Sequence, residues 1–431
     1  MAEKSRDILV IGAGIAGIQC SLDLADMGFK VHLVERQPSI GGRMAQLDKT
    51  FPTNDCSICI LSPKMADCAR HPNIDLLTYS EVKEVNGEGG GFRVKIQKYA
   101  RLIDEKKCVS CGDCSAKCPA RVPDEFDMRL RRREAVYRYY LQGIPATMTI
   151  DREHCLHVTK GICGICKKLC TREAVDFEQK DTGVELSVRS IVAATGFEPF
   201  DPSGMSSLGY GRYRNVITAL ECERFLSASG PTGGHLLRPS DRRPVERLGF
   251  IQCVGSRDLR NSPYCSSVCC MHATKEAMLS YEHDPNLRSY VFYMDLRAVG
   301  KDFQKYVSRA EQQYNVTYLR GRVAKIVPDK DECPIIFYEN LATSDVGKVK
   351  VDLAVLATTL MPSRGTAYLA KILGVELDEY GFIRTDPTSP LNTSRRGIFA
   401  CGCCRGPVDI PEAVSQASAA AAKAAEVTIE A

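Results

Sequence analysis

The sequence has little net charge and no long apolar segment. Its 57 Lys and Arg nearly balance 53 Asp and Glu, and the formal net charge of +4 is too small to indicate nucleic-acid binding. No uninterrupted apolar run reaches the roughly 20 residues that a membrane-spanning helix needs. The N-terminal residues MAEKSRDILVIGAG contain no apolar signal region. We therefore expect a cytoplasmic protein with no transmembrane segment and no nucleic-acid partner.

Several common catalytic arrangements are also missing. The sequence has no Ser/His/Asp array, no catalytic carboxylate pair and no P-loop. It has no internal repeats and, apart from alanines near the C-terminus, no low-complexity tract. A length of 431 residues, with 44% hydrophobic and 26% charged residues, is typical of a globular protein of two or three domains.

Cysteine is the residue that the chain has in excess, with 21 in total. So many cysteines are found in secreted disulfide proteins, but the missing signal region argues against that class. We therefore interpret the cysteines as reduced thiolates, most of them metal ligands.

Eight cysteines fall into two groups of four between residues 108 and 170. Cys108, Cys111, Cys114 and Cys118, followed by Pro119, have the bacterial ferredoxin spacing, in which the fourth cysteine ligates the other cluster. The second group is Cys155, Cys163, Cys166 and Cys170. Crossed ligation would give one cluster Cys108, Cys111, Cys114 and Cys170, and the other Cys118, Cys155, Cys163 and Cys166. A zinc ribbon is the alternative, but eight cysteines in runs of three plus one favour paired [4Fe-4S] clusters.

The N-terminal segment has the pattern of a dinucleotide-binding unit. A short apolar strand over 7–11 leads into Gly12, Gly14 and Gly17, a helical pattern follows over 18–27, and a second strand ends at Glu35. The glycines permit close approach of backbone N–H groups to a pyrophosphate, and Glu35 can accept hydrogen bonds from a ribose. The motif predicts a bound dinucleotide without distinguishing FAD from NAD.

Later motifs favour FAD. Gly42 and Arg43, which follow Gly41, look like the flavoprotein loop that lies along the FAD pyrophosphate. Thr195 and Gly196 follow a predicted strand over 186–193 and resemble a crossover between two dinucleotide domains, with a weaker copy over 357–362 after a strand over 351–356. Gly402 precedes an Ala-rich helix predicted over 411–425, whose N-terminus would face the flavin. Cys401 stands where flavoproteins with two dinucleotide domains usually have an aspartate.

A second α/β pattern follows without a second glycine fingerprint. Strands are predicted over 248–254, 287–294 and 316–319, and helices over 267–282 and 301–314. The first of these strands leads into Cys253-Val254-Gly255-Ser256-Arg257, which argues against direct nicotinamide binding. Cys253, Cys265, Cys269 and Cys270 lie nearby. On spacing alone this group could be a redox site, a zinc site, a third cluster or buried free thiols.

These patterns predict an α/β, two-dinucleotide-domain flavoprotein: a Rossmann-like FAD domain and a second α/β domain, with an inserted two-[4Fe-4S] ferredoxin domain. The FAD domain would comprise 1–100, 181–200 and 361–431, the ferredoxin domain 101–180, and the second α/β domain 201–360. A basic cluster of Arg129 to Arg133 with Arg138 is expected to be a solvated face or a docking patch for an acidic partner.

The chain closely resembles the FAD and iron–sulfur subunit of heterodisulfide reductase. Part of this resemblance lies in the group of Cys253, Cys265, Cys269 and Cys270. The resemblance also covers 54–65, 194–202, 215–234 and 406–425, and so nearly the whole chain. It implies an oxidoreductase subunit with FAD and three [4Fe-4S] clusters, the third on those four cysteines, and a Lys275 beside the flavin. It further implies partner subunits of a redox complex and electron transfer between flavin and partners, with flavin-based electron bifurcation as one route. Larger family members carry an N-terminal module and a C-terminal ferredoxin, and we expect neither here.

Two other functions stay open. One is a stand-alone NAD(P)H-dependent oxidoreductase or disulfide reductase, which the spacing of Cys56 and Cys59 after Gly42 would suit. The other is a relay and scaffold that binds clusters but no flavin. Cys20 is expected to be packing. The roles of Cys68, Cys222, Cys333, Cys401, Cys403 and Cys404 stay open, as do the electron donor and acceptor and the oligomeric state, a homodimer included.

Overall fold

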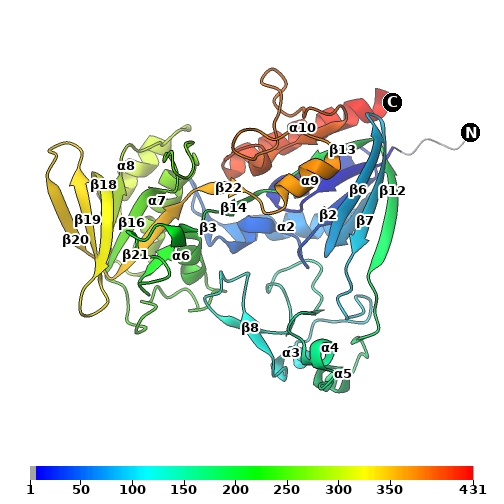
Figure 1. Cartoon of the computed structure of the whole chain (residues 1–431), viewed down its shortest axis with the longest axis horizontal. Coiled ribbons are helices and arrows are strands. Elements are labelled where there is room, and N and C mark those ends of the chain that lie inside the picture. The colour runs from blue at the N-terminus through cyan, green and yellow to red at the C-terminus, as the bar shows by residue number, and fades with distance from the viewer. Residues whose placement is uncertain (1–5, 431) are drawn as a thin grey trace, which may run out of the picture.

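A five-stranded parallel sheet forms the first half of the molecule in the computed structural model, which describes residues 6–430 (Figure 1). Its strands, in order across the sheet, are β23 (Ile398–Ala400), β13 (Ser190–Ala193), β1 (Ile8–Ile11), β2 (Val31–Glu35) and β5 (Ile74–Thr78). Every residue of β1 and β13 is buried, as expected for parallel strands covered on both faces. Segments nearly 400 residues apart in the chain therefore complete one sheet.

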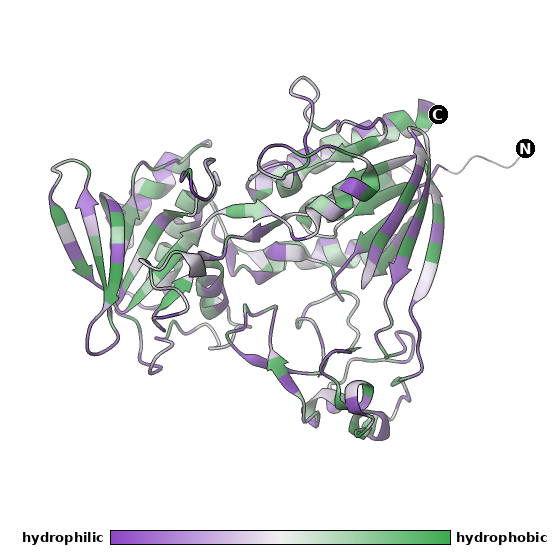
Figure 2. Cartoon of the chain, viewed as in Figure 1, coloured by the Kyte–Doolittle hydropathy of each residue, from purple (hydrophilic) through white to green (hydrophobic). Residues whose placement is uncertain are grey.

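The two faces of this sheet pack against different layers. Ile8 and Val10 of β1 belong to a core shared with α1 (Ile15–Asp26), α2 (Ser57–Arg70) and α10 (Ile410–Glu430). Leu9 and Ile11 point the other way, into a core shared with α9 (Thr366–Leu373) and the antiparallel strands β6 (Ser80–Glu88), β7 (Gly91–Lys98) and β12 (Thr182–Val188). The period of two along the strand thus assigns alternate residues to the helical and the sheet layer. Figure 2 shows hydrophobic (green) stretches on the sheet and on the helices that pack against it.

A seven-stranded sheet forms the second half. The strands, in order, are β15 (Val216–Thr218), β21 (Leu353–Thr358), β16 (Arg247–Val254), β17 (Arg288–Tyr293), β18 (Val316–Pro328), β19 (Pro334–Asn340) and β20 (Val346–Lys350). The first five strands are parallel to one another, and the pairs β18–β19 and β19–β20 are antiparallel. Its core includes residues of α6 (Ala219–Leu226), α7 (Cys269–His283) and α8 (Phe303–Gln313). Strands β14 (Phe197–Pro199) and β22 (Leu360–Pro362) pair as the two crossovers between the sheets. The prediction of an α/β protein with two dinucleotide-type sheets is confirmed.

Between β7 and β12 the chain leaves the first half and returns beside its point of exit. Lys98 of β7 pairs with Thr182 of β12, so the intervening segment leaves and re-enters the first half at adjacent strand ends (Figure 1). Its elements are short: α3 (Asp113–Ala116), β8 (Arg121–Pro123), β9 (Arg132–Glu134), β10 (Val136–Tyr137), β11 (Thr149–Ile150), α4 (Leu156–Lys160) and α5 (Ile165–Leu169). The smallest elements elsewhere are η1 (Gly42–Gln46), β3 (Lys49–Thr50), β4 (Asp55–Cys56), η2 (Pro202–Gly204) and η3 (Gly402–Cys404).

Arginines fasten this segment, which contains little regular hydrogen bonding. Arg133 donates to both carboxylate oxygens of Glu125 and to Asp151, and its guanidinium lies 3.6 Å from the centre of the Tyr137 ring. Arg138 donates from Nε to the Ser110 hydroxyl at 2.8 Å. Much of the predicted basic cluster therefore binds neighbouring loops. Charge-assisted contacts of this kind stabilise loops that cannot form a ladder.

Most predicted elements are confirmed, with one informative difference. The strand expected over 186–193 is two strands, β12 and β13, which belong to different sheets. Arg189 lies between them. The continuous apolar run gave no sign of the break, because both strands are buried on at least one face. Residues 86–91 lie at the antiparallel hairpin that connects β6 and β7.

A buried ion pair connects the inserted segment to the second half. Arg224 of α6 donates from Nε to Asp127 Oδ1 at 2.7 Å, and the two side chains are 1% and 0% exposed. Arg224 also donates to the Gln46 carbonyl at 2.9 Å, and the Gln46 side chain donates to the Phe126 carbonyl at 2.7 Å. Three segments that are distant in sequence therefore meet at one guanidinium.

We predict that Asp127→Ala lowers the free energy of unfolding by about 3–5 kcal/mol, because it leaves the buried Arg224 charge unpaired. Glu125→Ala is the matched control. Glu125 pairs with Arg133, but its side chain is 41% exposed, so its loss should cost less than about 1 kcal/mol. Urea denaturation followed by far-ultraviolet circular dichroism measures both. Equal losses in the two variants would contradict the importance of the buried pair.

Candidate functional site

The glycine loop after β1 has room only for glycine at two positions. Gly12 has φ +102°, and a Cβ there would lie 2.5 Å from the Ala194 carbonyl oxygen. A Cβ on Gly17 would lie 1.8 Å from the Gly12 carbonyl oxygen. Helix α1 can therefore approach the loop only because both residues lack side chains. At Gly14, by contrast, the nearest atom to an added Cβ is Gly42 Cα at 3.9 Å, so the loop presents open backbone there.

Four predicted dinucleotide residues gather at one edge of the first sheet. Gly12 follows β1, Glu35 ends β2, Thr195 follows β13 and Gly402 follows β23. The carboxyl ends of parallel strands lie on the same side, and ligands of open α/β sheets bind there. The fold thus brings these residues together although the sequence spreads them over nearly 400 positions.

Unpartnered polar atoms at this edge fit a bound dinucleotide. The Thr195 hydroxyl and the Arg405 Nε are buried and have no hydrogen-bond partner among residues 6–430. Gly196 has φ +68° with no atom within 4 Å of an added Cβ, so the space beside Thr195 is open. Buried polar groups without partners are rare in proteins and indicate an absent ligand or water.

Glu35 shapes the loop that it was predicted to serve. Its Oε2 accepts from the Ala13 N–H at 2.7 Å and its Oε1 from the Gln37 N–H at 2.8 Å. Burial raises the pKa of Glu35, and the two N–H groups oppose that rise. A ribose hydroxyl would therefore share a carboxylate that already fixes the backbone of the glycine loop.

Gly42, Arg43 and Gly402 lie on the segments that surround this edge. A Cβ on Gly42 would lie 2.8 Å from Gly14 Cα, so the two loops touch. Arg43 donates to the Gln46 side chain at 2.9 Å and forms an ion pair with Glu198 of β14. The Gly402 N–H donates to the Gln416 side chain of α10 at 2.9 Å. Arg43 therefore ties its loop to the first crossover, and Gly402 is anchored to the C-terminal helix.

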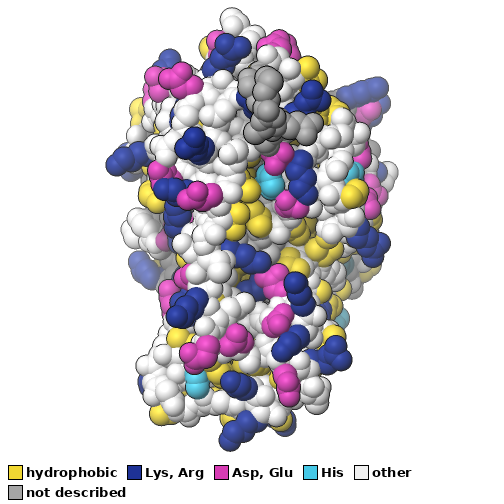
Figure 3. Space-filling model, turned by 90° about the vertical axis from the view of Figure 1, so that its right-hand side faces the viewer, with side chains coloured by type: hydrophobic (Ala, Val, Ile, Leu, Met, Phe, Trp, Pro, Cys, Tyr) yellow, Lys and Arg dark blue, Asp and Glu magenta, His cyan; other side chains and the backbone are white. Residues whose placement is uncertain are grey.

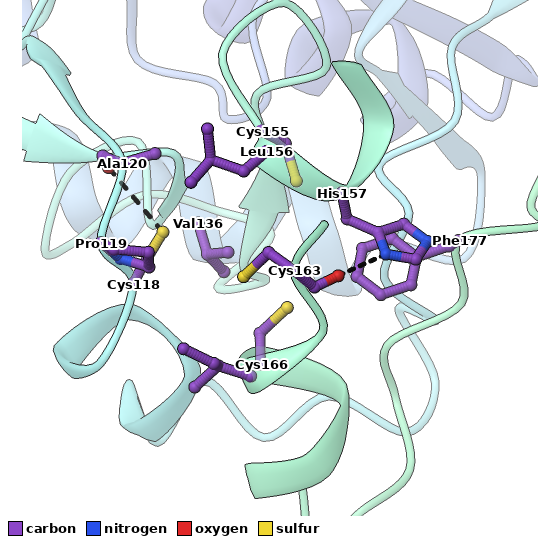
Figure 4. Close-up of a pocket in the computed structure, with 11 residues that line it drawn as sticks. Cys118, Pro119, Ala120, Val136, Cys155, Leu156, His157, Cys163, Cys166 and Phe177 are labelled. Carbon is purple, nitrogen blue, oxygen red and sulfur yellow. Dashed lines mark hydrogen bonds between the residues drawn. The ribbon is translucent and has the colours of Figure 1, made fainter. Parts of the chain in front are cut away.

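Four cysteines of the inserted segment face one cavity. Cys118, Cys155, Cys163 and Cys166 line it together with Val136, Leu156 and Phe177, and Figure 4 shows their sulfur atoms pointing inward from separate segments. His157 closes one side, with its ring 3.8 Å from that of Phe177. Burial, followed by the nearby Cys155, raises the pKa of Cys166 to about 11. This set is one of the two that crossed ligation predicts. A multivalent cation would compensate for the crowding of its thiolates.

The other predicted set lies in the same small core. Cys108, Cys114 and Cys170 share a hydrophobic cluster with Val175. Burial, followed by the nearby Cys108, Cys166 and Cys111, raises the pKa of Cys114 to about 12. The Ala174 N–H donates to the Cys170 sulfur at 3.3 Å, an interaction that favours a thiolate.

The third group of cysteines lies where β16 meets α7. Burial, followed by the nearby Cys270 and Cys265, raises the pKa of Cys253 to about 11. Burial is also the main cause that raises the pKa of Cys269, followed by the nearby Cys253, Cys270 and Cys265. Cys253 has φ +59° in the loop that replaces a glycine fingerprint.

The same loop has no free space beside Gly255. A Cβ on Gly255 would lie 2.6 Å from the Phe200 ring, which therefore covers the backbone there. The loop thus differs from the open glycine loop at Gly14.

Lys275 is buried, whereas its position in the sequence alone would suggest a surface lysine. Its side chain is 1% exposed, forms an ion pair with Glu223 and donates to the Lys49 carbonyl at 2.9 Å. Glu223 also contacts His272 Nε2 at 2.7 Å. Burial alone would raise the pKa of Glu223, but Lys275 and His272 lower it below its usual value. Sequence reasoning missed Glu223 because a single acid in a short helix carries no pattern.

A second acid beside this pair is in the opposite electrostatic situation. Glu276 is fully buried, its oxygens accept no hydrogen bond from a nitrogen or hydroxyl donor of residues 6–430, and its carboxyl adjoins the Cys222 thiol. Burial, followed by repulsion from Glu223, raises the pKa of Glu276 well above its usual value. The charged form is therefore favoured at Glu223 and the neutral form at Glu276.

Cys56 and Cys59 form a disulfide at the start of α2, with their Cα atoms 5.3 Å apart. The expectation that all cysteines are reduced is thus wrong for this pair. The other 19 are free, and Cys20 is buried in the first core, as predicted for a packing residue. The free cysteines outside the three groups are buried or half-buried: Cys20, Cys68, Cys222, Cys333, Cys401, Cys403 and Cys404.

The fold and the glycine loop define the class of two-domain dinucleotide-binding proteins. Residues 6–238 and 292–424 match the sequence model of the pyridine nucleotide-disulphide oxidoreductase family. These ranges comprise most of the chain, which therefore belongs to that family. Residues 239–291, which contain all four cysteines of the third group, lie outside the match.

The chain is also similar to curated relatives over nearly its whole length. It is 46% identical over 98% of its residues to the A-type iron-sulfur subunit of the CoB–CoM heterodisulfide reductase of Methanocaldococcus jannaschii. It is 45% identical over 97% to the A-type subunit of the H(2):CoB–CoM heterodisulfide, ferredoxin reductase of Methanothermobacter marburgensis. The predicted resemblance to this subunit of heterodisulfide reductase is confirmed. The chain spans 64% and 63% of the length of these two relatives.

Among solved structures the likeness is one of fold. The thioredoxin reductase of T. acidophilum aligns with a TM-score of 0.54 and 14% identity, covering 99% of this chain and 100% of that one. The thioredoxin reductase of Lactococcus lactis aligns with the same TM-score and 17% identity, covering 99% of each chain. In the part of the chain that the structure describes, no helix is long and apolar enough to cross a membrane.

We predict opposite behaviour for two matched variants. Glu223→Gln should lower the free energy of unfolding at pH 7 by about 3–5 kcal/mol, because Lys275 loses its buried counter-ion. Glu276→Gln should change it by less than about 1 kcal/mol, because burial favours the neutral form of this carboxyl and glutamine is a neutral group of similar size.

The pH dependence follows from the lowered pKa of Glu223. A group whose pKa is lowered by folding stabilises the protein above its unfolded pKa, about 4.3 for Glu, and loses that effect as the pH falls through the folded pKa. Urea denaturation between pH 3 and 7 should show that the parent and Glu276→Gln lose stability as the pH falls. Glu223→Gln should lose less stability over the same range. An unchanged acid slope in Glu223→Gln would refute the assignment.

Proposed function

We propose that the chain is an electron-transfer flavoprotein subunit that holds one FAD and three [4Fe-4S] clusters. The observation that carries this proposal is the convergence of Cys118, Cys155, Cys163 and Cys166 on one cavity (Figure 4). Their spacing predicts one member of a ferredoxin cluster pair, and they come from three separate stretches of the inserted segment. Such a segment, attached to a dinucleotide-binding sheet, places one-electron carriers beside a two-electron carrier.

In this proposal each residue has a limited task. Gly12, Gly14 and Gly17, with Thr195 and Gly196, would bind the FAD pyrophosphate at the carboxyl edge of the first sheet. Glu35 would orient the adenosine ribose through the loop that it already fixes. FAD, when bound, accepts or donates electrons singly or in pairs, whereas each cluster passes one.

The remaining ligand sets follow the same proposal. The first cluster would be held by Cys108, Cys111, Cys114 and Cys170, and the third by Cys253, Cys265, Cys269 and Cys270. Lys275 would lie beside the flavin, where its buried ammonium would favour an added negative charge. Its pairing with Glu223 holds that charge in position.

Other subunits of a heterodisulfide reductase-like complex are the proposed partners. The names of the relatives describe them as subunits, and one name joins heterodisulfide and ferredoxin. We extend this to electron transfer between flavin and partner redox proteins, with electron bifurcation at the flavin as the route. Residues 101–180 contain 16 Lys and Arg against 12 Asp and Glu, an excess equal to the chain's net charge of +4. On the face in Figure 3 the two signs are nevertheless interspersed.

We predict one FAD and about twelve iron per chain after anaerobic purification, from three four-iron clusters. Replacing Cys253, Cys265, Cys269 and Cys270 with serine should lower the iron to about eight and leave FAD in place. Gly17→Val should abolish FAD binding but retain iron. Gly183→Ala is its control, because an added Cβ there meets no atom within 4 Å. Flavin fluorescence and iron assays measure these contents, and absent flavin in the parent chain would overturn the proposal.

A stand-alone NAD(P)H-dependent oxidoreductase is the second candidate, and membership of the pyridine nucleotide family favours it. The covered backbone at Gly255 argues against it. We predict that stopped-flow mixing of the flavin-loaded chain with NADH leaves the flavin absorbance unchanged over seconds, whereas dithionite bleaches it. Rapid bleaching by NADH would favour this second function.

A further inference from the structure

The loop over residues 253–265, between β16 and α7, is folded back on itself. The Arg257 N–H donates to the Tyr264 carbonyl at 3.0 Å, and the Ser256 hydroxyl donates to the same carbonyl at 2.7 Å. The cysteines at the two ends of the loop therefore lie near each other, and both belong to the third group of four.

Arg257 has a backbone conformation that is unusual for arginine. Its φ of +58° lies in the left-handed region, which glycine adopts more readily than a residue with a side chain. A glycine at this position would fit the turn and would lack only the side chain. The guanidinium is therefore the feature of Arg257 whose contacts need an explanation.

The guanidinium of Arg257 belongs to a small group of charged side chains. It forms an ion pair with Asp295, which follows β17, and Asp295 also accepts from Arg297 Nε at 3.2 Å. Two positive charges thus share one negative charge. The Arg257 side chain is 25% exposed and so is partly shielded from solvent, which makes its charge felt more strongly by its neighbours.

Two of these charges act on the sulfurs of the third group of cysteines. Burial is the largest influence on the pKa of Cys253 and raises it, whereas the Arg257 guanidinium lowers it. Burial also raises the pKa of Cys270, Asp295 adds to that rise, and Arg257 opposes it. Arg257 and Asp295 therefore act in opposite directions on one sulfur.

We propose that Arg257 raises, and Asp295 lowers, the reduction potential of the cluster that Cys253, Cys265, Cys269 and Cys270 would hold. This inference rests on the proposed function, which assigns a [4Fe-4S] cluster to these four cysteines. Reduction adds one electron, so the reduced state has one more negative charge than the oxidised state. The guanidinium attracts that charge and the carboxylate repels it. Net charge near the sulfurs is one of the factors that set cluster potentials.

Redox titration of matched variants tests the proposal. The anaerobically purified chain, loaded with FAD and iron, is titrated with dithionite in the presence of redox mediators, and the paramagnetic signals of the reduced clusters are recorded. The signal that disappears when the four cysteines of the third group are replaced with serine identifies the cluster of interest. Iron and FAD contents are measured on the same samples.

Arg257→Gln should lower the ratio of reduced to oxidised third cluster at a fixed ambient potential at least about threefold, and Asp295→Asn should raise it at least about threefold. For a one-electron step a threefold change corresponds to about 28 mV. Arg257→Lys retains the charge, so its ratio should return toward that of the parent.

Arg260→Gln is the matched control. Arg260 lies on the same loop and pairs with Asp258 at 3.4 Å, but its side chain is 81% exposed. Water and salt screen such a charge, so the potential of the third cluster should equal that of the parent. The other two clusters should be unchanged in all four variants.

Shifts of the same sign in Arg257→Gln and Asp295→Asn would overturn the proposal, because an ion pair that only holds the loop would affect both variants alike. Unmoved potentials would also overturn it, and one FAD with about twelve iron in the parent would then leave the proposed function standing. About eight iron in the parent would contradict the third ligand set and this inference together. If Arg257→Gln retains less iron than the parent, the shift in Asp295→Asn decides, since that substitution leaves the backbone contacts of the loop intact.

Discussion

Two neighbouring buried residues of α6 determine how the parts of this protein meet. Glu223 pairs with Lys275 of α7 and accepts from the Asp48 N–H at 2.9 Å. Arg224 pairs with Asp127 of the inserted segment and donates to the Gln46 carbonyl. Buried charges are costly to leave unpaired, so each pair resists separation. The contacts of Glu223 and Arg224 therefore hold three parts together at one point. These are the loop at residues 46–48 after β2, the inserted segment and the second half of the molecule.

This junction lies among the candidate redox groups. The loop that it fixes follows directly from Gly42 and Arg43, the segment that it fixes contains two groups of cysteines, and α7 begins with Cys269 and Cys270. An arrangement of carriers works only if their separations are constant. In the inserted segment, which has few hydrogen bonds between strands, charged contacts keep these separations constant.

Much of the fold was predictable because it rests on local patterns. The strand–glycine–helix unit at residues 7–35 has a hydrophobic period and turn residues that permit one local structure. The convergence of Cys118, Cys155, Cys163 and Cys166 on one cavity was predictable because ligand spacing is itself the signal. The break in the strand at Arg189 and the contacts of Arg133 and Arg138 were not predictable. An apolar or a basic run in a sequence has the same pattern whichever residues it contacts in the fold.

The sequence by itself determined which residues are glycine, cysteine and apolar, and hence the class of fold and the candidate ligands. Only the tertiary structure decided that the pKa of Glu223 is lowered while that of Glu276 is raised, and that Lys275 is buried. It also decided that Cys56 and Cys59 are joined while nineteen other cysteines are free. The reason is physical: spacing along a chain fixes what a residue can do, but burial and neighbouring charges fix its protonation and its partner.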